Sequence, residues 1–98
     1  MKKFFFVIVF LFSLNAFSYT VQGSQECGDI IYEDRMNNDM MYQAVTSWLQ
    51  GYITARNFIT DSDKGADFHS LYFALLNFCK DFPLKDIDDA AIFIYSTL

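Results

Sequence analysis

The chain has 98 residues, of which 53% are hydrophobic and 19% aromatic, and its formal net charge is −5 near neutral pH. A chain of this length builds one modest core, and an acidic surface lacks the clustered cations that a nucleic-acid backbone requires. We therefore expect a single domain that does not bind nucleic acid. The aromatic content argues against disorder.

Residues 1–18 have the pattern of a cleavable secretory signal peptide. Two lysines follow the initiator Met, a short apolar run comes next, and Ala16 and Ser18 are the small residues of a cleavage site. The apolar run falls short of the roughly 20 residues that span a bilayer, so an uncleaved anchor is the weaker alternative. We expect cleavage after Ser18, a periplasmic or secreted location, and no membrane contact for residues 19–98.

Two cysteines, Cys27 and Cys79, lie in the expected mature chain. In an exported protein an even number of cysteines predicts a disulfide, and two cysteines allow only one pairing. A zinc site would need ligands beyond two thiols and the lone His69, and no CxxC spacing points to redox chemistry. We expect a structural disulfide, with no metal and no cofactor.

Residues 27–38 have mixed character and are compatible with a short strand or one helical turn. From Asn38 or Asp39, either of which can cap, an apolar stripe at spacings of three and four predicts a helix over residues 39–58. The stripe comprises Met41, Val45, Trp48, Leu49, Tyr52 and Arg56. Gly51 interrupts this helix, and we expect it to allow close approach of a neighbouring helix rather than to act as a hinge.

A second stripe predicts a helix over residues 65–80, with Cys79 on its buried side. Its members are Phe68, Leu71, Tyr72, Leu75, Leu76 and Cys79, with Phe73 and Phe78 widening the face. Pro83 ends this helix. A third helix begins near Asp86, and its buried face comprises Ile87, Ala90, Ala91 and Ile94. The predicted fold is an all-α domain of three to four helices over residues 19–98, closed by one disulfide.

Ionisable residues show no catalytic motif. The cluster of Asp61, Asp63 and Asp67 departs from the EF-hand order, so a solvated loop with a helix cap is the better interpretation. Nothing positions a nucleophile against a base, and we expect no catalytic residues and no enzymatic activity. Asp39 and Asp86, with Asp61 or Asp63 as further candidates, are placed to cap helices, and His69 is the lone histidine. We assign Asp39, Asp86 and His69 as pH-responsive groups.

Aromatic side chains are too numerous for three small helices to bury, so some should form an exposed patch, which usually marks a partner surface. We assign Trp48, Gly51, Tyr52, Phe68 and Tyr72 to an interface for a second copy or for client proteins. A monomer with an adhesive surface is the alternative.

The order of Cys27, a helix bearing Gly51–Tyr52, and Cys79 at the end of the next helix resembles the HdeA/HdeB family of periplasmic acid-stress chaperones. This resemblance implies a helical fold, a neutral-pH homodimer, and acid-triggered release of apolar surface that holds unfolding clients. Cys27 and Cys79 match the family's disulfide, and Gly51–Tyr52 its Gly–aromatic pair. The shortage of lysines and the corner at Pro83 depart from it.

A weaker resemblance links the chain to the periplasmic immunity proteins of type VI secretion systems, whose Cys-x-Pro pattern residues 77–83 echo only loosely. We expect an exported, non-catalytic protein that binds protein, with an HdeA-like acid-activated chaperone as the leading hypothesis. The competing hypothesis is an immunity or inhibitor protein that neutralises one secreted effector. A third is an exported helical protein whose patch serves dimerisation alone.

Overall fold

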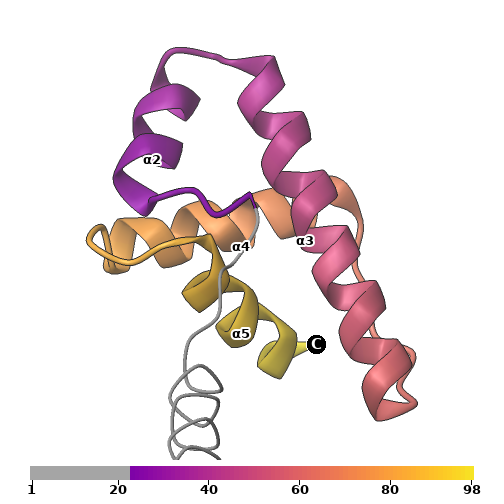
Figure 1. Cartoon of the computed structure of the whole chain (residues 1–98). Coiled ribbons are helices and arrows are strands. Elements are labelled where there is room, and N and C mark those ends of the chain that lie inside the picture. Colours follow the sequence, from indigo (N-terminus) through magenta and orange to yellow (C-terminus); the bar gives the residue numbers. More distant parts are fainter. Residues whose placement is uncertain (1–22) are drawn as a thin grey trace, which may run out of the picture.

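The computed structural model describes residues 23–98, so the expected signal peptide at residues 1–18 lies outside the described residues. Within the described range the chain forms four helices and no strand, which confirms the all-α prediction (Figure 1). They are α2 (Cys27–Arg35), α3 (Asp39–Thr60), α4 (Phe68–Asp81) and α5 (Ile87–Thr97).

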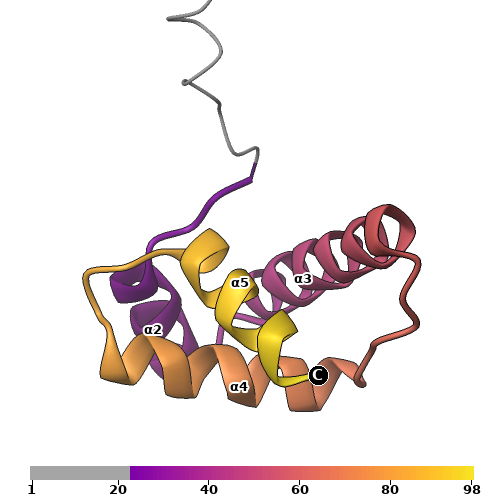
Figure 2. The ribbon, with the colours of Figure 1, turned by 90° about the horizontal axis from the view of Figure 1, so that it is seen from below.

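Helix α4 is the platform of the domain. It packs against α2, α3 and α5, which all lie on the same side of it (Figure 2). Its buried residues repeat at helical spacing, and the core forms where this face meets the other helices. The fully buried side chains of the core include Ile30, Val45, Leu49, Leu71, Leu75 and Ile87.

For residues 27–38 the sequence allowed a short strand or one helical turn, and the structure has helix α2 there. The segment is a nine-residue helix, and the strand alternative is wrong. Cys27 and Ile30 are its buried residues, one turn apart on the face toward the core. Asn37 then takes a left-handed conformation with φ 55°, which Asn tolerates better than most residues, and the chain turns into α3.

Helix α3 begins where the sequence predicted and ends two residues later. Asn38 is the cap, because its side-chain oxygen accepts hydrogen bonds from the backbone N–H groups of Met40 (3.0 Å) and Met41 (3.2 Å). The expectation that Asp39 caps this helix is wrong. The predicted stripe is also shifted, since Ile53 is buried whereas Arg56 is exposed.

Helices α4 and α5 each begin after an aspartate cap. Asp67 accepts a hydrogen bond from the Ser70 backbone N–H at 2.7 Å, so α4 begins at Phe68 rather than at residue 65. Asp86 accepts from the Asp89 backbone N–H at 3.2 Å, as expected. Two predicted core positions of α4 are wrong, since Phe68 and Phe73 are 48% and 62% exposed.

A disulfide between Cys27 and Cys79 joins the start of α2 to the end of α4, with 4.9 Å between the two Cα atoms. Both cysteines are fully buried, as the apolar stripe predicted for Cys79. Beside it, residues 25–27 pair with residues 85–87: Cys27 N–H donates to the Lys85 carbonyl (2.9 Å) and Ile87 N–H to the Gln25 carbonyl (2.8 Å). The disulfide and this pairing together tie α2, α4 and the start of α5.

Gly51 does not serve a close helix contact. It is exposed in the middle of α3, and a Cβ atom placed there would have no neighbour within 4 Å among the described residues. The expectation that Gly51 lets another helix of this domain approach is therefore wrong. The glycine leaves a weak point in α3, because it has the lowest helix propensity after proline.

Loss of the disulfide should destabilise the domain. The bridge joins residues 52 positions apart, and closing a loop of that length in the unfolded chain stabilises the fold by about 4 kcal/mol in the chain-entropy model. We expect the double variant Cys27→Ser/Cys79→Ser to lose about that much free energy of unfolding, measured by urea denaturation. Equal stability of the variant and the oxidised protein would contradict this.

Replacing Gly51 should stabilise the protein. We expect Gly51→Ala to raise the free energy of unfolding by about 1 kcal/mol, since the site is open and helical. Gly23→Ala is the contrasting variant: φ is +74° there, and a Cβ would lie 3.0 Å from Trp48 Cδ1, so it should destabilise. Thermal unfolding monitored by circular dichroism distinguishes the two, and a fall in melting temperature for Gly51→Ala would refute this account of α3.

Candidate functional site

The hollows on the described surface include two that differ in chemistry. The α2–α3 pocket, of about 170 Å³, is polar and is lined by Asp34, Asn37, Asn38, Asp39, Tyr42 and Tyr72. The α4–α5 groove, of about 440 Å³, is mostly apolar and is lined by Phe78, Phe82, Lys85, Asp89, Ile92, Phe93 and Ser96. Helix α4 contributes to both, through Tyr72 in the pocket and Phe78 in the groove, and we consider each in turn.

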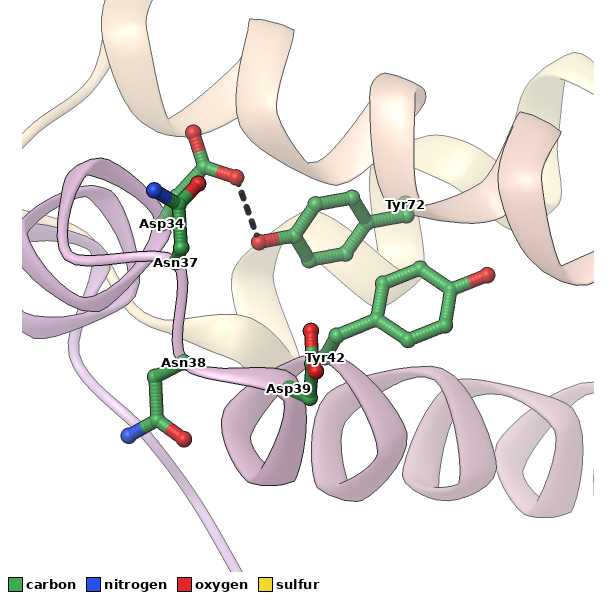
Figure 3. Close-up of a pocket in the computed structure, with 6 residues that line it drawn as sticks. All are labelled: Asp34, Asn37, Asn38, Asp39, Tyr42 and Tyr72. Carbon is green, nitrogen blue, oxygen red and sulfur yellow. Dashed lines mark hydrogen bonds between the residues drawn. The ribbon is translucent and has the colours of Figure 1, made fainter.

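The α2–α3 pocket is centred on a hydrogen bond between helices. The Tyr72 hydroxyl donates to Asp34 Oδ1 at 2.7 Å, which joins α4 to the end of α2 (Figure 3). The Tyr42 ring meets the Tyr72 ring edge-on, with centroids 4.7 Å apart. Burial, and then the hydrogen bond to the Asp34 carboxylate, raise the pKa of Tyr72 well above its ordinary value of 10.0. Tyr72 therefore stays a neutral donor to Asp34 through the physiological range.

His69 joins this group through Tyr42. The Tyr42 hydroxyl lies 3.1 Å from His69 Nδ1. A phenol hydroxyl can donate to or accept from an imidazole nitrogen, so the direction of this hydrogen bond depends on the His69 tautomer. Through the Tyr72–Asp34 and Tyr42–His69 contacts, the α2–α3 pocket is a structural junction of α2, α3 and α4.

The α4–α5 groove has an aromatic floor. The Phe78 ring, itself buried, lies 5.0 Å from the Phe82 ring and 5.6 Å from the Phe93 ring, centroid to centroid. Lys85 lies at one edge, its Nζ 5.5 Å from the Phe82 ring centroid. This contact is a cation–π interaction, which leaves the ammonium exposed to solvent.

The rim of the groove is unusually apolar for a solvent-exposed surface. The exposed fractions are 46% for Phe82, 59% for Ile92 and 53% for Phe93, and Leu84 in the same connection is fully exposed. Phe82, Ile92 and Phe93, three large apolar side chains that line one groove, form the kind of patch that marks a protein partner. Neighbouring α5 residues Ile87, Ala90, Ala91 and Ile94 are buried, so the helix that presents Ile92 and Phe93 is fixed to the core.

The residues that the sequence assigned to an interface do not form one surface. Trp48 and Tyr52 stack on α3, 5.8 Å between ring centroids, and both are half-buried against the core. Tyr52 meets Tyr95 of α5 edge-on, whereas Tyr72 is buried beside Tyr42.

Of the remaining assigned residues, Gly51 and Phe68 are exposed. Phe68 is therefore the only aromatic residue among the five that is largely open to solvent.

Tyr95 of α5 contacts the C-terminal end of α3. The Tyr95 hydroxyl donates to Asn57 Oδ1 at 2.9 Å and lies 3.3 Å from Thr60 Oγ1. The Thr60 contact is the main cause that lowers the pKa of Tyr95 below its ordinary value of 10.0, and the nearby Lys64 and Arg56 act in the same direction. The aromatic cluster of Trp48, Tyr52 and Tyr95 thus belongs to a structural contact between these helices.

Of the assigned pH-responsive residues, Asp86 is a helix cap, Asp39 is exposed at the first position of α3, and His69 is exposed beside Tyr42. The sequence did not single out Asp67 as the cap of α4. The backbone N–H of Ser70, and then its hydroxyl (3.0 Å), lower the pKa of Asp67 below its ordinary value of 3.8. An aspartate three residues before Ser70 is the signal that identifies such a cap.

Asp86, Asp88 and Asp89 form the one group of carboxylates in the described chain that are close enough to share a metal ion, with ligand atoms within 4.8 Å of one another. All three lie at the start of α5, where the positive end of the helix dipole stabilises negative charge. That position accounts for them without a metal.

Sequence reasoning missed the α4–α5 groove, although a signal for it exists. Once Ile87, Ala90, Ala91 and Ile94 are placed on the buried face of a helix, Ile92 and Phe93 must point outward. Phe82 and Leu84, which flank Pro83, are large and apolar, and they lie in a segment that cannot be helical.

Comparison with known proteins gives no neighbour. No family model, no curated protein and no solved structure matches the chain. Among residues 23–98, no helix combines the length and apolar character that a membrane crossing requires. The candidate site therefore rests on the geometry of the groove.

Removing the Tyr72 hydroxyl should weaken the junction of α2 and α4. Tyr72→Phe deletes the donor to Asp34, and hydrogen bonds to charged groups contribute more than neutral ones, so we expect a loss of about 1–2 kcal/mol in the free energy of unfolding. Tyr32→Phe is the control, since Tyr32 is 60% exposed and its hydroxyl bonds to no described residue. Equal effects of the two substitutions in urea denaturation would contradict this role.

Asp67 should contribute to acid sensitivity. Because its folded-state pKa is lowered, its contribution to stability is present above the unfolded value near 3.8 and is lost as pH falls through the folded value. Asn also caps helices but carries no titrating carboxyl, so Asp67→Asn should flatten the decline in melting temperature on acidification. Asp63→Asn serves as the control, and identical pH profiles for Asp67→Asn and the parent protein would refute the assignment.

Proposed function

We propose that this protein is exported and acts by binding other proteins through the α4–α5 groove. The observation that carries the proposal is the exposure of Phe82, Ile92 and Phe93 in one groove of a framework closed by a disulfide. Hiding such a patch from water is favourable, and a rigid patch loses little conformational entropy when a partner covers it. The groove is lined mainly by apolar side chains, which suits binding better than catalysis.

The leading form of this function is an acid-activated periplasmic chaperone of the HdeA-like type. Residues 19–98 carry five cations and twelve carboxylates, so complete protonation changes the side-chain charge from −7 to about +6, with His69 counted as charged. Asp67 caps α4, and its protonation weakens the start of the helix whose other end forms the groove. Acid therefore acts on an element that supports the apolar surface.

An aggregation assay tests this form. The oxidised, processed protein is mixed with an acid-labile enzyme at about pH 3, the mixture is neutralised, and aggregation is followed by light scattering. We expect suppression of aggregation, and we expect the groove variant Ile92→Ser/Phe93→Ser to suppress it several-fold less. The matched control is Phe58→Ser/Ile59→Ser, which removes two apolar residues that are 89% and 76% exposed at the end of α3.

Two results would contradict the proposal. Suppression no better than that of an inert protein of similar size would reject the chaperone form. Equal loss in the groove variant and in the α3 control would reject the groove as the binding surface.

The second candidate is an immunity or inhibitor protein with one dedicated partner. It is favoured by the fact that the groove is already open in the folded domain, so binding needs no loosening of helices. A fixed interface would bind near neutral pH, whereas the chaperone form would act only in acid. A toxin gene next to the gene for this protein, together with neutral-pH binding to that toxin, would favour this candidate.

A further inference from the structure

We propose that the segment bound in the α4–α5 groove is basic and amphipathic: one or two large apolar side chains with Lys or Arg beside them. This inference rests on the proposed protein-binding function and adds the chemistry of the partner that the folded protein binds near neutral pH. It depends on a juxtaposition of charge and apolar surface at the start of α5.

The acidic edge of the groove is the first part of that juxtaposition. Asp89 lines the groove, and its carboxylate belongs to the group with Asp86 and Asp88 whose oxygens lie within 4.8 Å of one another. Three negative charges therefore meet where the apolar floor ends. At this spacing the carboxylates repel one another, and a cation placed beside them would relieve that repulsion.

Hydrogen bonds within the domain do not satisfy all the oxygens of these three carboxylates. Asp86 Oδ1 accepts from the Asp89 backbone N–H, and Asp88 Oδ1 accepts from Ser24 Oγ at 3.0 Å. The Asp89 carboxylate forms no hydrogen bond with any residue of the described range, and none of the three carboxylates forms an ion pair there. All three are half-buried, so a partner's cation would reach them in a partly desolvated setting, where charge pairs are less screened than on an open surface.

Lys85 does not cancel the acidic edge. Its ammonium lies over the Phe82 ring, and it is the single cation among the residues that line the groove. The groove thus has one cation, Lys85, and one carboxylate, Asp89, which lies within 4.8 Å of the Asp86 and Asp88 carboxylates at the start of α5. A bound segment that places its apolar side chain over Phe78 and Phe93 and its cations toward Asp89 would match both features.

The charge of the whole chain favours the same partner. A net charge of −7 on residues 19–98 attracts basic segments from a distance and repels acidic ones. Electrostatic complementarity of this kind raises association rates and discriminates between partners, while the apolar contact holds the bound segment. An acidic partner, including a second copy of this chain, is disfavoured by the same field.

The test compares two synthetic peptides binding to the oxidised, processed protein near neutral pH. Both are short helix-forming peptides with the same Leu and Phe residues; one carries Lys and Arg at the flanking positions, and the other carries Glu. Fluorescence anisotropy of a labelled peptide should show binding of the basic peptide at least about tenfold tighter, with the difference shrinking at high salt.

Two double variants locate the effect. Asp88→Asn/Asp89→Asn should weaken binding of the basic peptide several-fold, whereas Asp61→Asn/Asp63→Asn, with the same change in net charge in the loop before α4, should leave it nearly unchanged. Ile92→Ser/Phe93→Ser should weaken binding of the basic peptide through the loss of apolar contact. Circular dichroism confirms that each variant is folded.

Absence of binding, or equal binding of the two peptides, would overturn the inference, as would equal losses in the two Asp variants. If aggregation is suppressed through the groove but basic and acidic peptides bind alike, the function stands and the partner chemistry is wrong. If the basic peptide binds through the groove and the acidic edge but aggregation is not suppressed, the chaperone form fails and the partner chemistry stands.

Discussion

The bond between Cys27 and Cys79 and the backbone pairing beside it hold three helices at one point. The disulfide joins the first residue of α2 to the last turn of α4, and residues 25–27 pair with residues 85–87 at the start of α5. A domain of this size buries little apolar surface, so a covalent link that restricts the unfolded chain contributes a large share of its stability. The link lies inside the core, where both cysteines are fully buried.

This junction also determines where the candidate site forms. The connection from α4 to α5 is held at Lys85 by the Cys27 N–H, and the same short segment contains Phe82 and Leu84. A free connection would let these side chains fold onto one another or onto the core. Because the connection is held at both ends, Phe82 stays in the groove that it lines together with Phe93 of α5, and the apolar groove stays open in a domain that could otherwise bury it.

Sequence periodicity predicted α3, α4 and α5 because their apolar residues recur at spacings of three and four. It was less informative for α2, where Ile30, Ile31 and Tyr32 are consecutive and fit a strand or a helix equally well. Periodicity could not decide whether Asn38 or Asp39 caps α3. It also led to a wrong packing role for Gly51, because the surroundings of a glycine depend on tertiary contacts that the sequence pattern does not contain. The groove was missed for the same reason, since it combines two helices and the connection at Pro83.

Amide hydrogen exchange with and without the disulfide tests most directly whether this junction holds the groove in place. In the Cys27→Ser/Cys79→Ser variant, the account predicts that exchange accelerates at the Ile87 amide and through residues 82–86, while the middle of α3 stays protected and binding of the basic peptide weakens. Unchanged protection at residues 82–87, together with unchanged peptide binding, would show that the groove forms without the disulfide and would contradict the account.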